Sequence, residues 1–346
     1  MPSVTIDTCV FAAPPISVTY EEVLGYVETL LDWKILLREP WIAIYLSKNV
    51  SEAMLEDAVY PFRENLKVLF REKGILEYDP NTVVPVIEQL LRITPTFETY
   101  FRIHDILLQN VKTIPDILSI HTSEGLSSDL ARIVVMIAIL RSCCHQPILD
   151  HNLIIKPWCG GRKIEVTAQI VEIETSREDI SAIPEYPDYF QGEVFTCENF
   201  KEFVQNLDET VIWQASDCMD GLEVAIKVAV YKTRIHNKGE PDWEGVQGFN
   251  FGPSFYTRMR EMERSGSPGL IDRTIRAIVE TLEKMSLQDV HALRINEGGG
   301  SPQRMRGKDK AWRRDIDREY HLHYWELSNG EIEFASIGPH NDFDIP

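Results

Sequence analysis

The spacing of apolar residues changes once along the chain, and this change constrains the fold more than any other feature. Before Pro147 the apolar residues recur at helical spacing, as at Val23, Val27 and Leu30. After Pro147 apolar and polar residues alternate, as in residues 163–173. A chain that switches period in this way is predicted to begin with a mainly helical part and to continue with parts that combine strands and helices.

The chain has 346 residues, enough for two or three domains of ordinary size. We expect a multidomain α+β protein with a mainly helical domain at residues 1–147, a small α+β domain at 148–245 and a third domain at 254–346. The expected elements of the first two domains include helices at 96–111 and 127–144, a hairpin of 153–155 with 163–173, and strands at 211–215 and 221–232.

The third domain has a distinct order of expected elements, α-α-β-β-β-β. The dipeptide Asn329-Gly330 separates the last two alternating segments, and Asn-Gly is the strongest short hairpin signal in a sequence. The two helices are expected at 254–264 and 269–286, and the four strands at 291–295, 311–317, 319–327 and 330–337.

Charge is distributed unevenly along the chain. The formal net charge is −19, which argues against a protein that coats nucleic acid along its whole surface. Residues 255–346, however, hold 14 basic and 16 acidic residues, so residues 1–254 carry −17. Residues 294–314 hold seven basic and two acidic residues, a local charge of +5. Any contact with RNA is therefore expected within residues 294–340, which include this basic strip.

The chain is expected to be soluble and cytoplasmic, without a membrane contact. Its opening residues lack the basic and apolar regions of a secretory leader. Its longest apolar run, Ile133 to Leu140, has eight residues, whereas a membrane span needs about 20.

Cysteine and histidine cluster once in the sequence, at Cys143-Cys144-His145, with His151 and Cys159 downstream. Structural zinc sites usually show paired cysteines two to four residues apart, and no such pair occurs here. Vicinal cysteines at the end of an apolar helix are typical of a reduced core. We expect no metal site and no cofactor.

Several short motifs of the third domain resemble the RelE/ParE superfamily of bacterial toxins. Arg304-Met305-Arg306-Gly307 is similar to the basic-Gly step of that family, and Trp312-Arg313-Arg314-Asp315-Ile316 is similar to its aromatic-basic strand. Residues 320–324, Tyr-His-Leu-His-Tyr, resemble its Tyr-Arg-Leu-x-Tyr strand, and residues 336–340 resemble the end of its last strand. The resemblance covers residues 254–346 only, and it implies two helices packed on a small antiparallel sheet.

The resemblance also implies an RNA-targeting, toxin-like effector, either a ribosome-dependent or a free endoribonuclease, of the kind found in toxin–antitoxin or antiviral defence systems. By position, His340 would be the general acid, and Arg313 or Arg314 would bind the scissile phosphate. His321 would act as a base or a phosphate contact. The residues expected to bind RNA are Arg304, Arg306, Lys308, Lys310 and Trp312.

Two positions depart from the family pattern. His321 stands where RNase members usually keep an arginine, and Gln303 stands where some relatives have a glutamate. These departures leave open a catalytically inactive RelE-fold scaffold, and relatives that bind gyrase leave open a gyrase inhibitor. The acidic N-terminal region could mask the basic strip as an internal restraint, or it could recruit a protein partner.

Strand geometry limits which of these side chains can act together. Neighbouring residues of a strand point to opposite faces, so only one of Arg313 and Arg314 can reach a given ligand. His321 and His323 are two residues apart and share a face. That face is either a concave ligand surface or a packed interior, and Trp312 is either a base-stacking platform or core.

Overall fold

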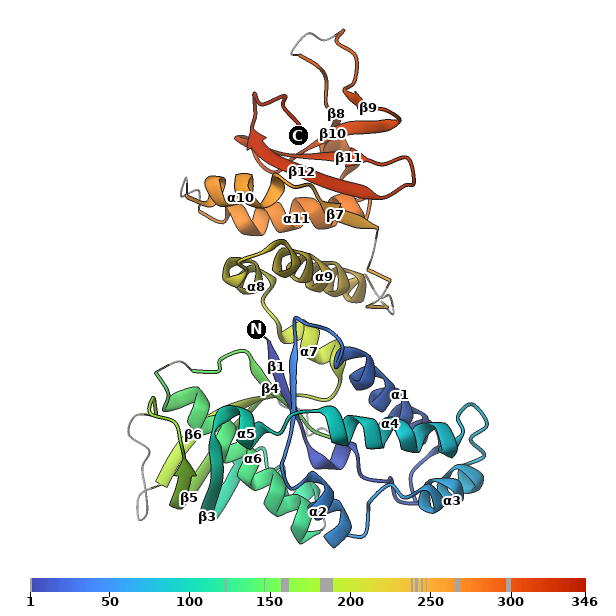
Figure 1. Ribbon diagram of the computed structural model, residues 1–346, viewed down its shortest axis with the longest axis vertical. Helices are drawn as coiled ribbons and strands as arrows, with labels where there is room; N and C mark the ends of the chain where they lie inside the picture. Colours follow the sequence, from blue (N-terminus) through green and yellow to red (C-terminus); the bar gives the residue numbers. More distant parts are fainter. Residues whose placement is uncertain are drawn as a thin grey trace. The chain divides into compact units, whose positions relative to one another are not determined.

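The structure is a computed structural model that describes residues 2–346, except 122, 146, 157–161, 181–188, 238, 240, 241, 244, 247, 265–267 and 297–299. The chain forms two compact units, Met1–Phe203 and Val204–Pro346 (blue to green and yellow to red in Figure 1). This division differs from the expected boundaries at 147 and 245–254, because strands from both sides of Pro147 share one sheet.

The first unit contains a mixed six-stranded sheet in the order β2-β1-β4-β6-β5-β3. Strands β1, β2, β4 and β6 are parallel neighbours, and β5 and β3 continue the sheet antiparallel. Its strands are β1 (Ser3–Ile6), β2 (Ala43–Leu46), β3 (Ile103–Ile114), β4 (His151–Ile154), β5 (Lys163–Thr175) and β6 (Tyr189–Cys197). Residues 1–147 are therefore not a separate helical domain, since they supply β1, β2 and β3.

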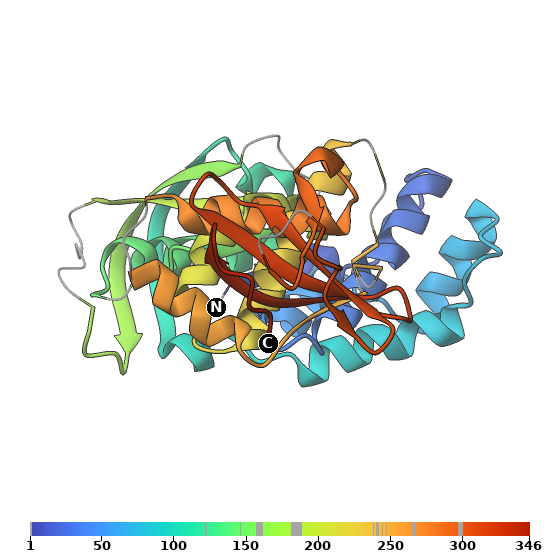
Figure 2. The same cartoon turned by 90° about the horizontal axis from the view of Figure 1, so that it is seen from above.

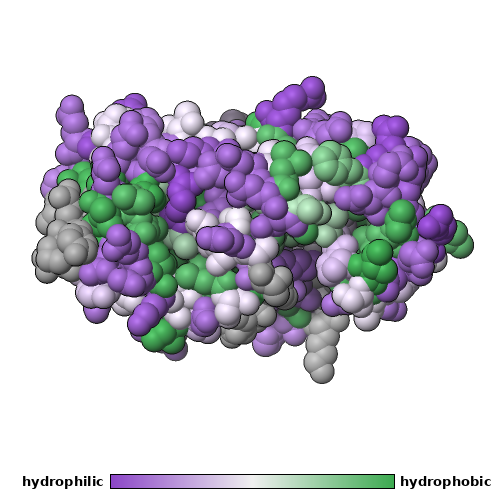
Figure 3. Space-filling model, turned by 90° about the horizontal axis from the view of Figure 1, so that it is seen from below, coloured by the Kyte–Doolittle hydropathy of each residue, from purple (hydrophilic) through white to green (hydrophobic). Residues whose placement is uncertain are grey.

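Helices surround this sheet. They are α1 (Tyr20–Leu36), α2 (Val50–Glu56), α3 (Arg63–Lys73), α4 (Pro80–Ile93), α5 (Phe97–Phe101), α6 (Glu124–Ser142) and α7 (Phe200–Asn206). Helix α6 confirms the helix expected at 127–144 and explains the long apolar run, because every side chain from Ile133 to Leu140 is buried in the core. The face seen in Figure 3 is mainly hydrophilic, with its apolar side chains in separate patches.

Several predictions of helices and strands before residue 245 were wrong. Residues 96–111 form α5 followed by β3, because Arg102 adopts a left-handed conformation that ends the helix. The expected hairpin of β4 with β5 is absent, since β4 pairs in parallel with β1 and β6. Residues 221–232 belong to a helix, α9 (Met219–His236), whose Ala225 and Ala229 fill the positions between the alternating apolar residues.

The second unit has three layers, visible in Figure 1: a sheet, then α10 (Phe255–Arg264) and α11 (Leu270–Leu282), then α8 (Glu209–Ala215) and α9. The sheet order is β7-β12-β11-β10-β8, and β9 pairs with β10. Its strands are β7 (Phe249–Phe251), β8 (Val290–Ala292), β9 (Met305–Arg306), β10 (Asp309–Asp315), β11 (Tyr320–Glu326) and β12 (Ile332–Pro339). The expected strand at 211–215 is helix α8.

The order of helices and strands expected after residue 254 is confirmed. Helices α10 and α11 precede the antiparallel strands, and Gly330, at φ +90°, closes the β11–β12 hairpin as the Asn-Gly signal predicts. The structure adds β7, a parallel partner of β12, and β9. It also adds α8 and α9, whose Trp213 and Leu222 are buried in the same core as α10 and α11.

The two faces of this second sheet differ in what covers them. Leu322, Tyr324 and Phe334 pack toward α10 and α11, which lie on one face (Figures 1 and 2). The other face, which we call the open face, carries no helix among the described residues. The C-terminal end of the chain lies against it (Figure 1), where Ile345 packs with Trp325.

No helix in the described part of the chain combines the length and apolar character required to span a bilayer.

Candidate functional site

Alternation along β10 and β11 places a column of polar side chains on the open face. In the β10–β11 register, Asp315 lies opposite His321, and Arg313 lies opposite His323. On the other side of β10, Arg313 lies opposite His291 of β8. Because side chains directly opposite each other in an antiparallel pair share a face, these polar residues lie side by side on the open face. The structure confirms that His321 and His323 face the same side.

His321 joins two neighbours into a chain of ionisable groups. Its Nδ1 lies 2.8 Å from Asp315 Oδ1, and its Nε2 lies 2.7 Å from His340 Nδ1. Burial lowers the pKa of His321; Arg313 and His340 lower it further, and the Asp315 carboxylate opposes them. His321 therefore stays neutral near pH 7. The ring of His340 is exposed to solvent at the end of this chain.

His323 lies deeper in the sheet and takes no part in the exposed surface. The tail of the chain covers it, and Asp344 O lies 3.2 Å from its Nδ1. Burial lowers the pKa of His323 to about 4, so its ring is neutral at physiological pH. His323 is therefore a buried residue between the sheet and the C-terminal tail.

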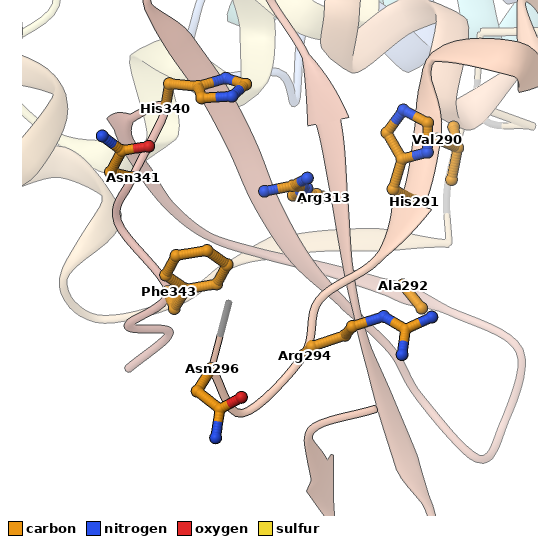
Figure 4. Close-up of a pocket in the computed structure, with 9 residues that line it drawn as sticks. All are labelled: Val290, His291, Ala292, Arg294, Asn296, Arg313, His340, Asn341 and Phe343. Atoms are coloured by element: carbon orange, nitrogen blue, oxygen red, sulfur yellow. The ribbon is translucent and has the colours of Figure 1, made fainter. Parts of the chain in front are cut away.

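We call the row formed by Asp315, His321 and His340 the relay. A hollow of about 490 Å³ opens beside it, lined in part by His340. In Figure 4 the guanidinium of Arg313 lies between the imidazoles of His340 and His291. Among the described residues Arg313 forms no salt bridge with a carboxylate, and its Nε has no hydrogen-bond partner. The hollow is lined by Val290, His291, Ala292, Arg294, Asn296, Arg313, His340, Asn341 and Phe343.

The structure separates the two arginines that the sequence left as alternatives. Arg314 is fully buried on the helix side of the sheet, where its Nη1 donates to Glu280 Oε2 at 2.8 Å and its Nη2 donates to Met285 O at 2.6 Å. A group held in this way cannot reach a ligand on the open face. Arg314 is therefore a structural residue, and Arg313 is the candidate.

Some of the basic strip is paired with neighbouring acids. Arg306 contacts Glu333 at 2.8 Å and Asp309 at 3.4 Å, and Arg304 lies 3.5 Å from Asp344. Lys308 and Lys310 are exposed. The local +5 in the sequence thus overstates the positive charge that is free of salt bridges, which lies partly at the hollow and partly at the exposed Lys308 and Lys310.

Trp312 does not belong to the open face. It packs with the core on the helix side, and its Nε1 donates to Glu326 Oε2 at 2.9 Å. The expectation that it binds RNA is not supported by this position, because a base could not stack on a ring that already covers the core.

Sequence reasoning missed three contributors to the hollow, His291, Asn296 and Phe343. His291 falls within an expected strand, and the signal that identifies it is its register opposite Arg313, which a sequence alone does not reveal. Phe343 lies in a segment interpreted as a polar tail, yet its ring centroid lies 5.9 Å from Arg313 Cζ.

The remaining sequence candidates are the cysteine and histidine cluster near residue 143 and the three glycines at 298–300. His151 is buried, and its two ring nitrogens lie 2.8 Å from Ser3 Oγ and 2.9 Å from Thr5 Oγ1, so neither nitrogen can approach the cysteines at 143 and 144 as a ligand. Cys159 and the glycines at 298 and 299 lie outside the described residues.

Comparisons of the chain with protein-family models, with curated proteins and with solved structures find no match. The candidate site is therefore defined by its own geometry: an arginine that forms no salt bridge with the described residues lies between two imidazoles, and one of these imidazoles ends a relay to a carboxylate.

Proposed function

We propose that the C-terminal unit binds single-stranded RNA and cleaves it as a toxin-like endoribonuclease. The observation that carries this proposal is the position of Arg313, a cation without a salt bridge among the described residues, between His340 and His291. The resemblance of residues 304–340 to RelE/ParE toxins, stated from the sequence, agrees with the same substrate class.

Substrate binding follows from the charge of the hollow. A guanidinium offers a planar pair of donors that matches two oxygens of a phosphate. Arg313 would hold the scissile phosphate, and Arg294 at the rim would contact a neighbouring phosphate. The amides of Asn296 and Asn341 add neutral donors and acceptors that suit a ribose or a base edge.

Proton transfer follows from the relay. Asp315 favours a proton on His321 Nδ1, so His321 Nε2 accepts from His340 Nδ1–H. His340 lies at the exposed end of this relay, and its ring lines the hollow. His340 is then the general acid, as the sequence resemblance implies, and the exposed His291 is the general base.

The resulting reaction is a transesterification within the RNA, in which the ribose 2′-oxygen replaces the 5′-oxygen on phosphorus. His291 takes the proton of the ribose 2′-OH, and the 2′-oxygen attacks phosphorus while Arg313 neutralises the phosphorane oxygens. His340 protonates the 5′-oxygen as its bond to phosphorus breaks. The products are a 2′,3′-cyclic phosphate and a 5′-hydroxyl end.

The N-terminal unit would act as the restraint or recruiting module. Residues 1–203 hold 17 basic and 30 acidic residues, a formal charge of −13. Opposite potentials favour docking of an acidic surface near a cationic hollow. The expected consequence is that the isolated unit Val204–Pro346 is more active than the full chain. A protein partner that engages the acidic unit would relieve the restraint.

A binding protein without catalysis is the second candidate. It is favoured by the salt bridges of Arg304 and Arg306 and by the tail, which covers His323. A gyrase inhibitor built on the same fold would give DNA damage without RNA cleavage.

The test uses the full chain and the unit Val204–Pro346 with an end-labelled RNA, with and without ribosomes, in buffer that contains EDTA. Cleavage of RNA, loss of cleavage when the attacking 2′-OH is replaced by hydrogen, and a cyclic phosphate end support the proposal. His340→Ala is expected to lower the rate by about 10²–10⁴-fold, whereas the matched surface variant Lys308→Ala is expected to retain it. RNA binding with no cleavage under any condition would leave the binding protein as the correct assignment.

A further inference from the structure

The carboxyl ends of two parallel strands in the first unit bring together residues far apart in sequence. The chain leaves β1 for β2 on one side and returns to β4 on the other, so a topological switch point lies between β1 and β4. Ligands of open α/β sheets bind outside the carboxyl ends of strands at such points. Asp7 follows β1 directly, and Lys156 follows β4 by two residues.

Three different donor side chains meet at this switch point. His121 Nε2 lies 3.1 Å from Asp7 Oδ2, and Cys9 Sγ lies 2.5 Å from the same oxygen. The ligand atoms of Asp7, Cys9 and His121 all lie within 4.8 Å of one another. Cys9 Sγ also lies 2.7 Å from the backbone oxygen of Lys156, which places a fourth donor atom at the edge of the cluster.

Burial makes this cluster costly without a cation. The side chains of Asp7 and His121 are only 2% and 4% exposed. Asp129, whose Oδ2 accepts from Thr8 between Asp7 and Cys9, is buried too. Buried carboxylates are destabilising unless a positive charge compensates them. His121 pairs with Asp7 but serves both acids of the cluster, and Arg132 lies 3.8 Å from Asp129 and also pairs with Asp105.

The kinds of donor indicate which ion would fit. Thiolate and imidazole ligands select zinc and related transition metals, whereas magnesium and calcium prefer a shell of oxygen atoms. Zinc bonds of about 2.0–2.3 Å place tetrahedral ligand atoms roughly 3.3–3.8 Å apart. The distances from Asp7 Oδ2 to Cys9 Sγ and to His121 Nε2 are shorter than this spacing. Small side-chain rotations would widen them to it, since all three side chains already converge.

We propose that Asp7, Cys9 and His121 bind one divalent transition-metal ion of the zinc class, with the Lys156 carbonyl oxygen or a water molecule as the fourth ligand. Binding replaces the thiol proton of Cys9, which passes to solvent, by a metal–sulfur bond. The ion connects the end of β1, the end of β4 and the segment before α6, and compensates the buried carboxylates. This site is independent of the hollow in the second unit.

The experiment uses the full chain. Protein purified without chelator and reconstituted with excess Zn²⁺ is expected to retain about one zinc per chain after desalting, measured by elemental analysis. Replacement by Co²⁺ is expected to give a sulfur-to-cobalt charge-transfer band in the near ultraviolet. Cys9→Ala and His121→Gln are expected to weaken the affinity by more than the roughly 10–100-fold that loss of an outer-shell partner causes.

The matched controls are Cys197→Ala, another buried cysteine of the same unit, and His104→Gln, an exposed histidine, and both should bind zinc like the unmodified chain. The unmodified chain decides the question even where a variant fails to fold. Less than a tenth of an equivalent of zinc after reconstitution, or bound cobalt without a sulfur band, would overturn the proposal. Unchanged affinity in a folded Cys9→Ala variant would overturn it as well.

Discussion

Arg313 and Arg314 are neighbours in sequence with opposite expected roles, and replacing each by glutamine separates them. In Arg313→Gln a charge-assisted contact with phosphate is lost. Such contacts contribute about 1.5–3 kcal/mol, which corresponds to roughly 10- to 150-fold in affinity. Stability should change little, because no carboxylate among the described residues depends on Arg313 for a salt bridge.

Arg314→Gln should behave in the opposite way. Arg314 is fully buried, and its removal leaves Glu280 and the Met285 carbonyl oxygen without their partner. Breaking a buried pair costs about 3–5 kcal/mol. The lower end applies here because the Glu280 side chain is still 24% exposed. For a unit of this size about 3 kcal/mol lowers the melting temperature by about 10 °C.

The assay combines fluorescence anisotropy of a labelled single-stranded RNA with thermal unfolding followed by circular dichroism, both on Val204–Pro346. Titrations at several salt concentrations should show a slope smaller by about one in Arg313→Gln, since one phosphate contact is removed. If Arg313→Gln binds RNA like the unmodified unit while a folded Arg314→Gln loses affinity, the assignment of the two faces is refuted.

Three further predictions concern the same unit. Because the pKa of His323 is about 4 when folded against 6.5 as its ordinary value, the unfolded chain binds more protons between these limits. Stability that is complete above pH 6.5 should then fall by up to about 3 kcal/mol toward pH 4, and in His323→Asn the melting temperature should lose most of this pH dependence. Asp315→Asn should reduce the cleavage rate, because His321 loses the carboxylate charge that lies 2.8 Å from its Nδ1 and orients its ring toward His340; an unchanged rate would contradict the relay. A shortened chain that begins at residue 254 should unfold more readily than one that begins at Val204, since Trp213 and Leu222 complete the core of α10 and α11; equal melting temperatures would show that α8 and α9 are dispensable.

Local patterns predicted the elements that are governed by local physics. Turn geometry predicts the Asn329-Gly330 turn. The periods of helix and strand predict the amphipathic α11 and the placement of Arg313 and Arg314 on opposite faces of the sheet. The strand predicted at 221–232, where the structure has helix α9, was wrong. Apolar alternation fits a strand as well as it fits a helix that is buried on most of its surface. The helix predicted at 96–111 was wrong over the residues of strand β3. This strand pairs with β5, about 60 residues further along the sequence, and that pairing outweighs the local preference for a helix.

The sequence by itself determined that two helices precede antiparallel strands after residue 254, that acidic charge is concentrated before it, and that His321 and His323 share a face. Only the tertiary structure decided which face is open, that Arg306 and Arg304 pair with Glu333 and Asp344, and that His291 joins His340 around Arg313. The same holds for Asp7 and His121, which are 114 residues apart. Contacts of this kind depend on sheet order and register, which arise from the packing of the whole unit and leave no pattern in any short stretch of chain.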